Sequence, residues 1–177
     1  NALTLGSPIK GQLSTSTDVD YYKFTAASSG SVSITLNTPT NSSYDYFKFT
    51  LYDSSNNALG QYSTGKDLTA SLGISAAGTY YVKVAAAGYS HDAGEYNLTA
   101  SLAAGSAAGF ESESNSSAST ANALTLGSPI KGQLSTSTDV DYYKFTAASS
   151  GSVSITLNTP TNNSYSDYFK FTLYDSS

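Results

Sequence analysis

The heptapeptide Asp-Val-Asp-Tyr-Tyr-Lys-Phe at residues 18–24 returns unchanged at residues 139–145. After its two carboxylates, alternate residues are large and apolar, so that Tyr22 and Phe24 share one face of a predicted β-strand. The acidic pair lies at the boundary between a predicted loop and that strand. The sequence therefore predicts the same arrangement twice, a core strand that is entered from a loop with two carboxylates.

The repetition extends far beyond this heptapeptide. Residues 1–55, the first copy, recur as residues 122–177, the second copy, with Asn163 in place of Ser42 and with Ser166 inserted. Internal repeats of this kind indicate tandem structural modules. We expect the chain to be a window on a longer array of near-identical modules.

Composition and spacing predict an all-β fold. Fifteen Tyr and seven Phe supply the large apolar side chains, and there is no Trp, Met or Cys. Tyr, Thr and Val favour pleated strands, whereas Ser, Asn and Gly favour turns. An antiparallel, jelly-roll-like β-sandwich is expected for each module. Its eight predicted strands lie at residues 9–13, 20–26, 31–36, 47–52, 58–62, 68–72, 79–85 and 95–102.

Three regions follow from these patterns. Residues 1–109 are expected to form a nearly complete first sandwich, and residues 122–177 the N-terminal half of a second one. Residues 110–121 join them and have two interpretations. Their Ser and Ala content is typical of a flexible linker. Their Glu-x-Glu-x-Asn pattern instead places three oxygen-bearing side chains on one side of an extended segment, which suits a calcium ion.

The order of motifs resembles the bacterial pre-peptidase C-terminal domain. The resemblance is carried by ESESN, ALTLGSPIKGQL, DVDYYKF, GSVSITL, FTLYDSS, AAGTYYVKV and GEYNLTASL. It spans the first sandwich and the visible part of the second. It implies a β-sandwich that accompanies secreted peptidases and other exported proteins without being catalytic. The collagen-binding domains of clostridial collagenases are similar to this family.

The resemblance also implies calcium ligands. Calcium-binding relatives use a Glu-x-Glu-x-Asn-Asp segment and Asp residues in the loop before the Tyr-rich strand. Here Ser116 replaces the Asp of that segment, and the loop carboxylates are spaced Asp-x-Asp. The alternative is that Asp18 and Asp20 are merely turn residues, whose side chains bond the nearby backbone. The expected metal ligands are Glu111, Glu113, Asn115 and one or both of Asp139 and Asp141, with Asp18 and Asp20 as the loop counterparts in the first copy.

Several classes of function are disfavoured. The net charge of −5 and the absence of Arg argue against a nucleic-acid partner. No apolar run reaches the length of a membrane helix, so membrane insertion is not expected. The one His, His91, stands between Ser90 and Asp92, and adjacent residues cannot form a catalytic relay. We expect no enzymatic activity.

The sequence thus favours a non-catalytic, extracellular or cell-surface module in a fibre, filament or adhesin stalk with calcium-stabilised junctions. The alternative is a protein- or glycan-binding accessory domain of a secreted hydrolase. Copies of the chain itself are the expected partners, through tandem modules or strand complementation between chains. Four aromatic residues in or beside loops are candidate ligand contacts, or else they cover strand edges: Tyr44, Tyr46, Tyr62 and Tyr89.

Overall fold

The computed structural model describes residues 1–105, 109–159 and 168–175. Two compact units are present, Asn1–Phe145 and Thr146–Ser177. The first unit contains eight consecutive strands, and the described residues include no α-helix. The described part of the chain therefore contains no helix that could span a membrane. The strands are β1 (Ile9–Gln12), β2 (Val19–Ala26), β3 (Gly30–Asn37), β4 (Phe47–Tyr52), β5 (Ala58–Thr64), β6 (Leu68–Ile74), β7 (Gly78–Ala86) and β8 (Glu95–Ala104).

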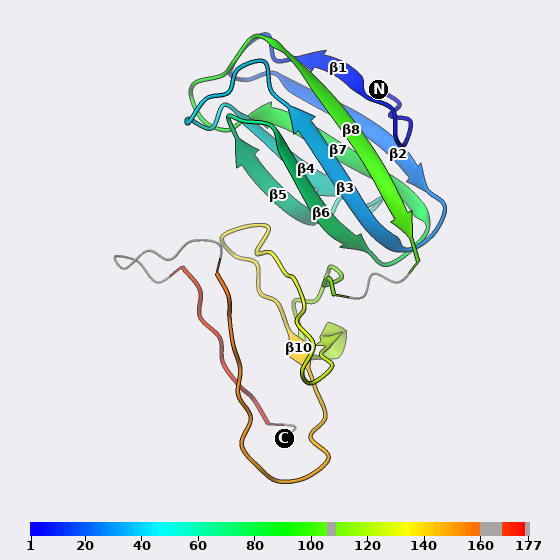
Figure 1. The fold of residues 1–177 in the computed structure, drawn as a ribbon, viewed down its shortest axis with the longest axis vertical. Coiled ribbons are helices and arrows are strands. Elements are labelled where there is room, and N and C mark those ends of the chain that lie inside the picture. Colours follow the sequence, from blue (N-terminus) through cyan, green and yellow to red (C-terminus); the bar gives the residue numbers. More distant parts are fainter. Residues whose placement is uncertain (106–108, 160–167, 176–177) are drawn as a thin grey trace. The chain divides into compact units, whose positions relative to one another are not determined.

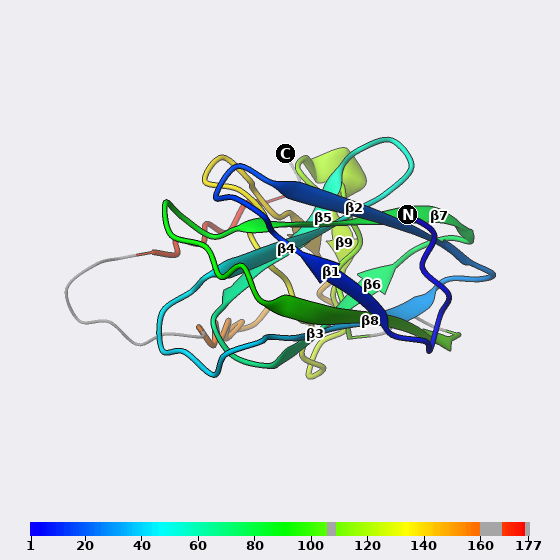
Figure 2. The ribbon, with the colours of Figure 1, turned by 90° about the horizontal axis from the view of Figure 1, so that it is seen from above.

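These strands form two antiparallel sheets that pack face to face (Figure 1). One sheet has the order β1-β8-β3-β6 and the other has the order β2-β7-β4-β5, which together are the strand order of a jelly roll. Viewed from above, β3 and β8 lie in one layer and β2 and β7 in the other (Figure 2). The predicted sandwich is confirmed, and each expected strand is present to within two residues at either end.

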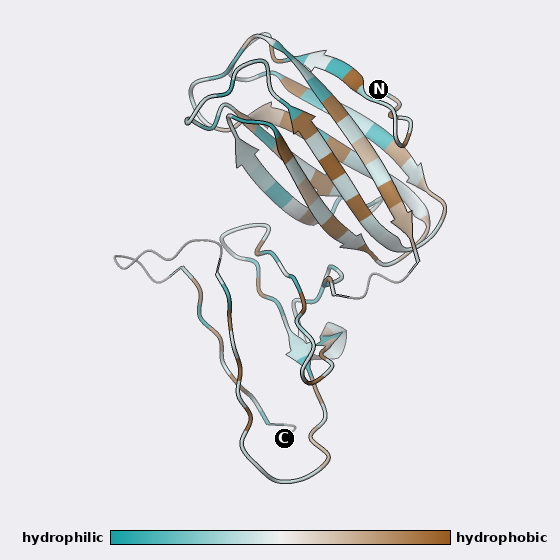
Figure 3. Ribbon diagram, viewed as in Figure 1, coloured by the Kyte–Doolittle hydropathy of each residue, from teal (hydrophilic) through white to brown (hydrophobic). Residues whose placement is uncertain are grey.

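The core lies between the sheets because each strand alternates apolar and polar residues. Bands of apolar residues cross the strands in Figure 3. In β3 the buried side chains are Val32, Ile34 and Leu36, and the Ser and Thr residues between them face outward. Phe47 packs edge-on against Tyr96 of the opposite sheet, with ring centroids 5.7 Å apart. Burying an aliphatic or aromatic side chain contributes about 1.5–3 kcal/mol, so these rows dominate the stability of the sandwich.

β3 is paired along both of its edges, with β6 on one side and β8 on the other. Ile34 lies opposite Ala70 of β6 and Ala100 of β8. Hydroxyl pairs line the outer face, where Oγ of Ser33 and Oγ of Ser71 are 2.8 Å apart. A shift of one residue would turn Ile34 to solvent, so the apolar pattern specifies this register.

Residues 109–145 follow the sandwich within the same unit. A short 3₁₀ turn spans Ala118–Thr120, and β9 (Asn122–Ala123) pairs in parallel with β10 (Tyr143–Lys144). The first copy contains the equivalent contact, an isolated parallel bridge between Ala2 and Lys23. The start of the module therefore packs beside the Tyr-rich strand in both copies.

The second unit exposes the apolar residues that the first sandwich buries. Ile155 is 44% exposed, whereas its counterpart Ile34 is fully buried. Phe171 is 59% exposed, whereas Phe49 is fully buried. Within residues 146–159 and 168–175 no strand pairing is assigned. The second copy contains the same apolar rows, but within this unit no described strand covers them.

Candidate metal centre

The segment of residues 110–115, which contains Glu111 and Glu113, is fixed at both of its ends by backbone hydrogen bonds. At one end the amide of Glu111 donates to the carbonyl of Lys131 (2.9 Å), and Phe110 and Lys131 form a parallel bridge. At the other end the carbonyl of Asn115 accepts a 2.9 Å bond from the amide of Tyr142. Residues 110–115 are thus held against the start of the second copy.

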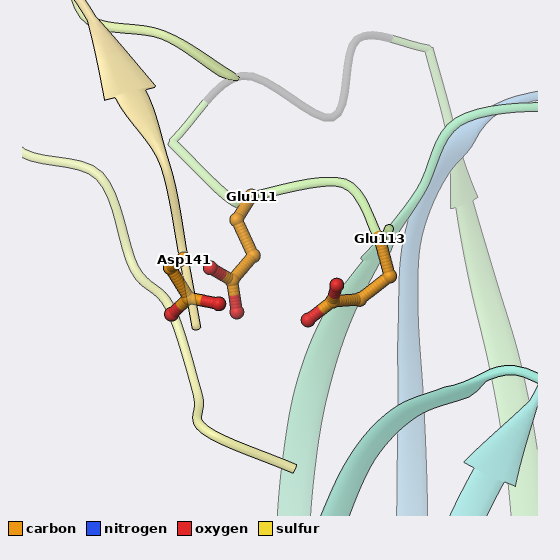
Figure 4. Close-up of side chains that lie close together, drawn as sticks. All are labelled: Glu111, Glu113 and Asp141. Carbon is orange, nitrogen blue, oxygen red and sulfur yellow. The ribbon is translucent and has the colours of Figure 1, made fainter. Parts of the chain in front are cut away.

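Three carboxylates converge on this segment (Figure 4). One oxygen each from Glu111, Glu113 and Asp141 lie within 4.8 Å of one another. Glu111 and Asp141 point toward each other, and Glu113 approaches from the other side (Figure 4). Glu111 is only 7% exposed, and Asn115 beside it is completely buried. The cluster can hold a metal ion because carboxylate oxygens separated by this distance can bind one cation.

Hydrogen bonds fix Glu111 from several directions. Its Oε1 accepts a 2.5 Å bond from the amide of Gln133. Its Oε2 accepts bonds from the hydroxyl of Tyr143 (2.5 Å) and from Nδ2 of Asn115 (3.3 Å). Nδ2 of Asn115 also donates to Oδ1 of Asn122 (3.2 Å), which leaves the amide oxygen of Asn115 facing away from these contacts. These donors orient the carboxylate of Glu111. The amide nitrogen of Asn115 is engaged in two of the bonds, whereas its oxygen accepts none from the described residues.

Three buried oxygens in this group accept no hydrogen bond within the described part of the chain. They are Oε1 of Glu113, Oδ1 of Asn115 and Oδ1 of Asp141. Buried polar atoms in folded proteins are nearly always paired, and an unpaired acceptor costs about 1–3 kcal/mol. A cation held by the three clustered carboxylates would provide a partner for Glu113 and Asp141. This chemistry fits the predicted calcium ligands.

The pKa values of Glu113 and Asp141 are raised because these carboxyls are buried close to other negative charges. Burial, followed by the negative charges of Asp139 and Glu111, raises the pKa of Glu113 to about 7. Burial, followed by its charge and hydrogen-bond interactions with Glu111, raises the pKa of Asp141 to about 8. Desolvation and like charge both favour protonated carboxyls, and a bound cation would reverse that preference.

Asp139 has a different environment from the three clustered carboxylates. Its Oδ2 accepts 2.7 Å bonds from the amide and the hydroxyl of Ser135. Asp18 has a similar bond in the first copy, because its Oδ2 accepts a 2.8 Å bond from the amide of Ser14. That amide bond is the main reason that the pKa of Asp18 lies below its usual value. Both residues therefore accept hydrogen bonds within their loops, and Asp139 acts on the cluster through its charge.

In the first copy Asp20 is hydrogen-bonded to a tyrosine. Its Oδ2 accepts a 2.5 Å bond from the hydroxyl of Tyr96, and the hydroxyl of Tyr22 lies 2.8 Å from that of Tyr96. Among the described residues, no cluster of three metal-ligating side chains surrounds Asp18 or Asp20. The carboxylate cluster is thus formed by the segment 110–115 together with the second copy.

The candidate ligand-contact tyrosines fall into two groups. Tyr44 and Tyr89 are strongly exposed, at 73% and 102%. Tyr46 and Tyr62 pack against the core, and Tyr62 stacks on Phe49 with centroids 5.5 Å apart. The first pair is therefore more accessible to an external partner than the second, which is partly buried.

Sequence reasoning missed two residues that position the site, Tyr143 and Gln133. The alternating pattern places Tyr143 on the core face of its strand, and this pattern carries no information about its hydroxyl. Gln133 donates through its backbone amide, which any residue except Pro can do. Neither role has a signal in the sequence.

Comparisons with known proteins gave matches of two kinds, to solved structures and to a family model. Among solved structures, the chain is similar to the pre-peptidase C-terminal domain of a collagenase from Bacillus anthracis, with 24% identity and a TM-score of 0.46. That similarity covers 56% of this chain and 92% of the other. A comparison with curated protein sequences gave no match. Residues 18–86, which include β2 through β7, match the family model of the bacterial pre-peptidase C-terminal domain.

Proposed function

We propose that this protein is a non-catalytic, extracellular module whose junction segment, residues 110–115, binds Ca²⁺. The observation that carries the proposal is the set of three buried oxygens, on Glu113, Asn115 and Asp141, that accept no hydrogen bond from the described residues. They lie beside Glu111, whose carboxylate is fixed by surrounding donors. Clustered negative charge and unpaired buried acceptors thus occur at the same place.

The ligand chemistry selects a hard divalent cation. All of the candidate ligand atoms are oxygens, from carboxylates and one amide. Soft metals prefer thiolates, and the chain has no Cys. Ca²⁺ accepts six to eight oxygens in irregular geometry, whereas Mg²⁺ demands a near-ideal octahedron and retains water. Extracellular calcium modules typically bind with dissociation constants of about 10⁻⁴ to 10⁻³ M.

Calcium would change the mechanics of the junction. With the ion bound, residues 110–115 are tied to the loop and strand around Asp141. Without it, the repulsion between Glu111, Glu113 and Asp141 opposes that contact. The segment therefore acts as a calcium-dependent clamp instead of a free linker. Near-identical repeated modules with clamped junctions suit a fibre, filament or adhesin stalk, where length and stiffness are the function.

A second function is favoured by the family match. The pre-peptidase C-terminal domain takes its name from peptidases, so the module is alternatively a binding accessory of a secreted hydrolase. Tyr44 and Tyr89 are the exposed aromatic residues that such a role would use. Loss of binding to an immobilised protein or glycan on Tyr44→Ala and Tyr89→Ala would support the accessory role. Binding that is unchanged in the variants, or no binding by the wild type and the variants alike, would favour the structural role.

Calcium titration of the whole chain tests the main proposal. Calorimetry should detect one class of site in the wild type and at least tenfold weaker binding in Glu113→Gln and Asp141→Asn, a loss of about 1.4 kcal/mol or more. Glu95→Gln is the matched control, because Glu95 pairs with Lys10 on the surface of the sandwich. Hydrogen exchange of residues 110–116 should slow when calcium replaces a chelator. Equal exchange in the two conditions would refute the clamp.

A further inference from the structure

β5 is an edge strand, with one side that no strand of its own sheet covers. It is the last strand in the order β2-β7-β4-β5, so β4 pairs with it on the other side only. In an antiparallel strand the N–H and C=O of one residue point to the same side, and successive residues alternate. The open edge therefore presents backbone groups that need partners, and it is a template for pairing with other chains.

One side chain pairs with both backbone groups of Gln61 on this open edge. Nε2 of Gln133 donates a 2.7 Å hydrogen bond to the carbonyl oxygen of Gln61, and Oε1 of Gln133 accepts a 2.7 Å bond from the amide of Gln61. The two residues are 72 positions apart in the sequence. Gln61 belongs to the first sandwich and Gln133 to the second copy, and both lie within the same compact unit.

The chemistry of this contact is specific to a side-chain amide. The planar amide of Gln carries a donor and an acceptor, as the peptide group of an adjacent strand does. A carboxylate only accepts and an ammonium group only donates, so neither could satisfy both backbone groups of Gln61. Gly60 permits the close approach, because a Cβ atom added there would lie 2.6 Å from Oε1 of Gln133. Gln133 thus replaces a neighbouring strand at this point of the edge.

The backbone around Gln133 is fixed independently of this contact. Its amide donates a 2.5 Å bond to Oε1 of Glu111. Two residues earlier, the amide of Lys131 donates to the carbonyl of Gly109, and the carbonyl of Lys131 accepts from the amide of Glu111, both at 2.9 Å. A side chain that extends from a fixed backbone loses less conformational freedom when it binds. Gln133 is therefore held in place for its bonds to Gln61.

Side chains from both parts of the chain border the same contact. A small cavity there is lined by Leu59, Tyr62 and Leu72 of the sandwich and by Phe110 and Gly132 of the residues that follow it. The two hydrogen bonds of Gln133 thus lie within a shared surface.

The first copy shows where this Gln lies in a complete sandwich. The counterpart of Gln133 is Gln12, the last residue of β1. Gln12 is exposed, and its Nε2 donates to the carbonyl of Ala93 in its own sandwich. A Gln at this position is therefore on the outer surface of its module, where it can reach a neighbouring module.

We propose that the open edge of β5 is a docking site for the following copy of the module, and that Gln133 is the positioning residue that holds it there. The joint fixes the orientation of one module on the next. It recurs wherever two copies follow one another, because the repeat carries the same Gln. It also occupies a point at which another chain could add a strand to β5. Its two bonds join neutral groups, so the joint does not rest on calcium binding.

Hydrogen exchange of the Gln61 amide, measured in chelator, tests the docking contact. Gln133→Leu removes both bonds and should accelerate this exchange at least about fivefold, which corresponds to the net value of one hydrogen bond. Gln133→Glu should also accelerate it, because a carboxylate faces the carbonyl of Gln61 without a donor. The intrinsic exchange rate is the same in every variant, since residues 60 and 61 are unchanged. Gln12→Leu, the same change at the counterpart position, is the matched control and should leave the exchange as in the wild type.

Paired spin labels test the orientation. The chain has no native Cys, so Ser101→Cys/Ser137→Cys introduces two labelling sites, both at exposed positions, one on the sandwich and one on the second copy. In chelator the distribution of distances between the labels should be narrow. Adding Gln133→Leu should broaden it, and adding Gln12→Leu should not. An excess of unlabelled chain should leave the distribution unchanged, because the contact is within one chain.

Four results would overturn the proposal. The first is protection of the Gln61 amide that persists in both Gln133 variants. The second is a distance distribution that stays narrow in Gln133→Leu, which would mean that other contacts set the orientation. The third is loss of the distance on dilution with unlabelled chain, which would assign the edge to a second molecule. The fourth is loss of β-sheet circular dichroism in Gln133→Leu, because the joint holds a sandwich that is already folded.

Discussion

The hydroxyl of Tyr143 donates a 2.5 Å hydrogen bond to Oε2 of Glu111, which lies 32 residues earlier in the chain. In the first copy the counterpart of Tyr143 is Tyr22, whose hydroxyl instead lies 2.8 Å from that of Tyr96. Burial and the bond to Glu111 raise the pKa of Tyr143, so it remains a proton donor at any physiological pH. The same residue thus orients a candidate metal ligand in one copy and joins a buried hydroxyl pair in the other.

Removing these two hydroxyls should have different consequences. Tyr143→Phe removes a bond that orients Glu111, and we expect calcium affinity to fall by about 10- to 100-fold. Tyr22→Phe should leave calcium affinity unchanged and lower the free energy of unfolding by about 1 kcal/mol, the net value of a hydrogen bond. Calorimetry and urea denaturation of both variants measure these effects. Equal calcium affinities in the two variants would contradict the role of Tyr143.

Calcium binding should strengthen as pH rises from 6 to 8.5. Glu113 and Asp141 have raised pKa values of about 7 and about 8, so protons compete with the ion below these values. In the absence of calcium the sign is opposite. Raised carboxyl pKa values favour the docked segment at acidic pH, and this contribution is lost as pH rises through 7 to 8.

Two measurements examine this linkage. Calorimetry at pH 7 in buffers of different ionisation enthalpy should show proton release on calcium binding. Hydrogen exchange of residues 110–116 in chelator should become faster as pH rises, beyond the intrinsic pH dependence of exchange. Asp141→Asn should reduce the proton release. Calcium binding that is independent of pH would be inconsistent with ligation by these two carboxyls.

Gly132 allows the closest approach within the site. A Cβ atom added there would lie 2.2 Å from the hydroxyl of Tyr143 and 2.6 Å from Oε2 of Glu111. Gly132→Ala must therefore displace one of these groups, and we expect calcium affinity to fall by at least about tenfold. Gly88→Ala is the control, because no atom lies within 4 Å of its added Cβ. Retention of wild-type affinity in Gly132→Ala would show that Glu111 is not a ligand.

The stability of the sandwich should depend on β5–β8 more than on the second copy. Leu98 is fully buried and lies opposite both Ile9 and Leu36, so Leu98→Ala should reduce the free energy of unfolding by about 2–5 kcal/mol. Leu157, the counterpart of Leu36, is 50% exposed. Leu157→Ala should therefore change the free energy of unfolding by no more than about 0.5 kcal/mol. Chemical denaturation checks both values, and a comparable loss in the two variants would be inconsistent with this core.

The sequence by itself determined the strands and their faces. Alternation around Val32, Ile34 and Leu36 allows one inward face, and a shift of one residue would expose all three side chains. Turn residues between such runs then mark where each strand ends. These signals are local, so eight strands and a two-layer fold could be predicted. The identity of the two copies is likewise read directly from the residues, without reference to structure.

Only the tertiary structure decided which strands are neighbours and which predicted ligands meet. The sequence grouped Asp139 with Asp141, yet Asp139 bonds to Ser135 while Asp141 turns toward Glu111. Residues two apart on a strand share a face, but a loop backbone can direct them to different partners. Burial is also collective, because the oxygens of Glu113 and Asn115 are removed from water only when the chain is folded. Calcium at this site stays a prediction, and its physical basis is the desolvation that only the folded chain produces.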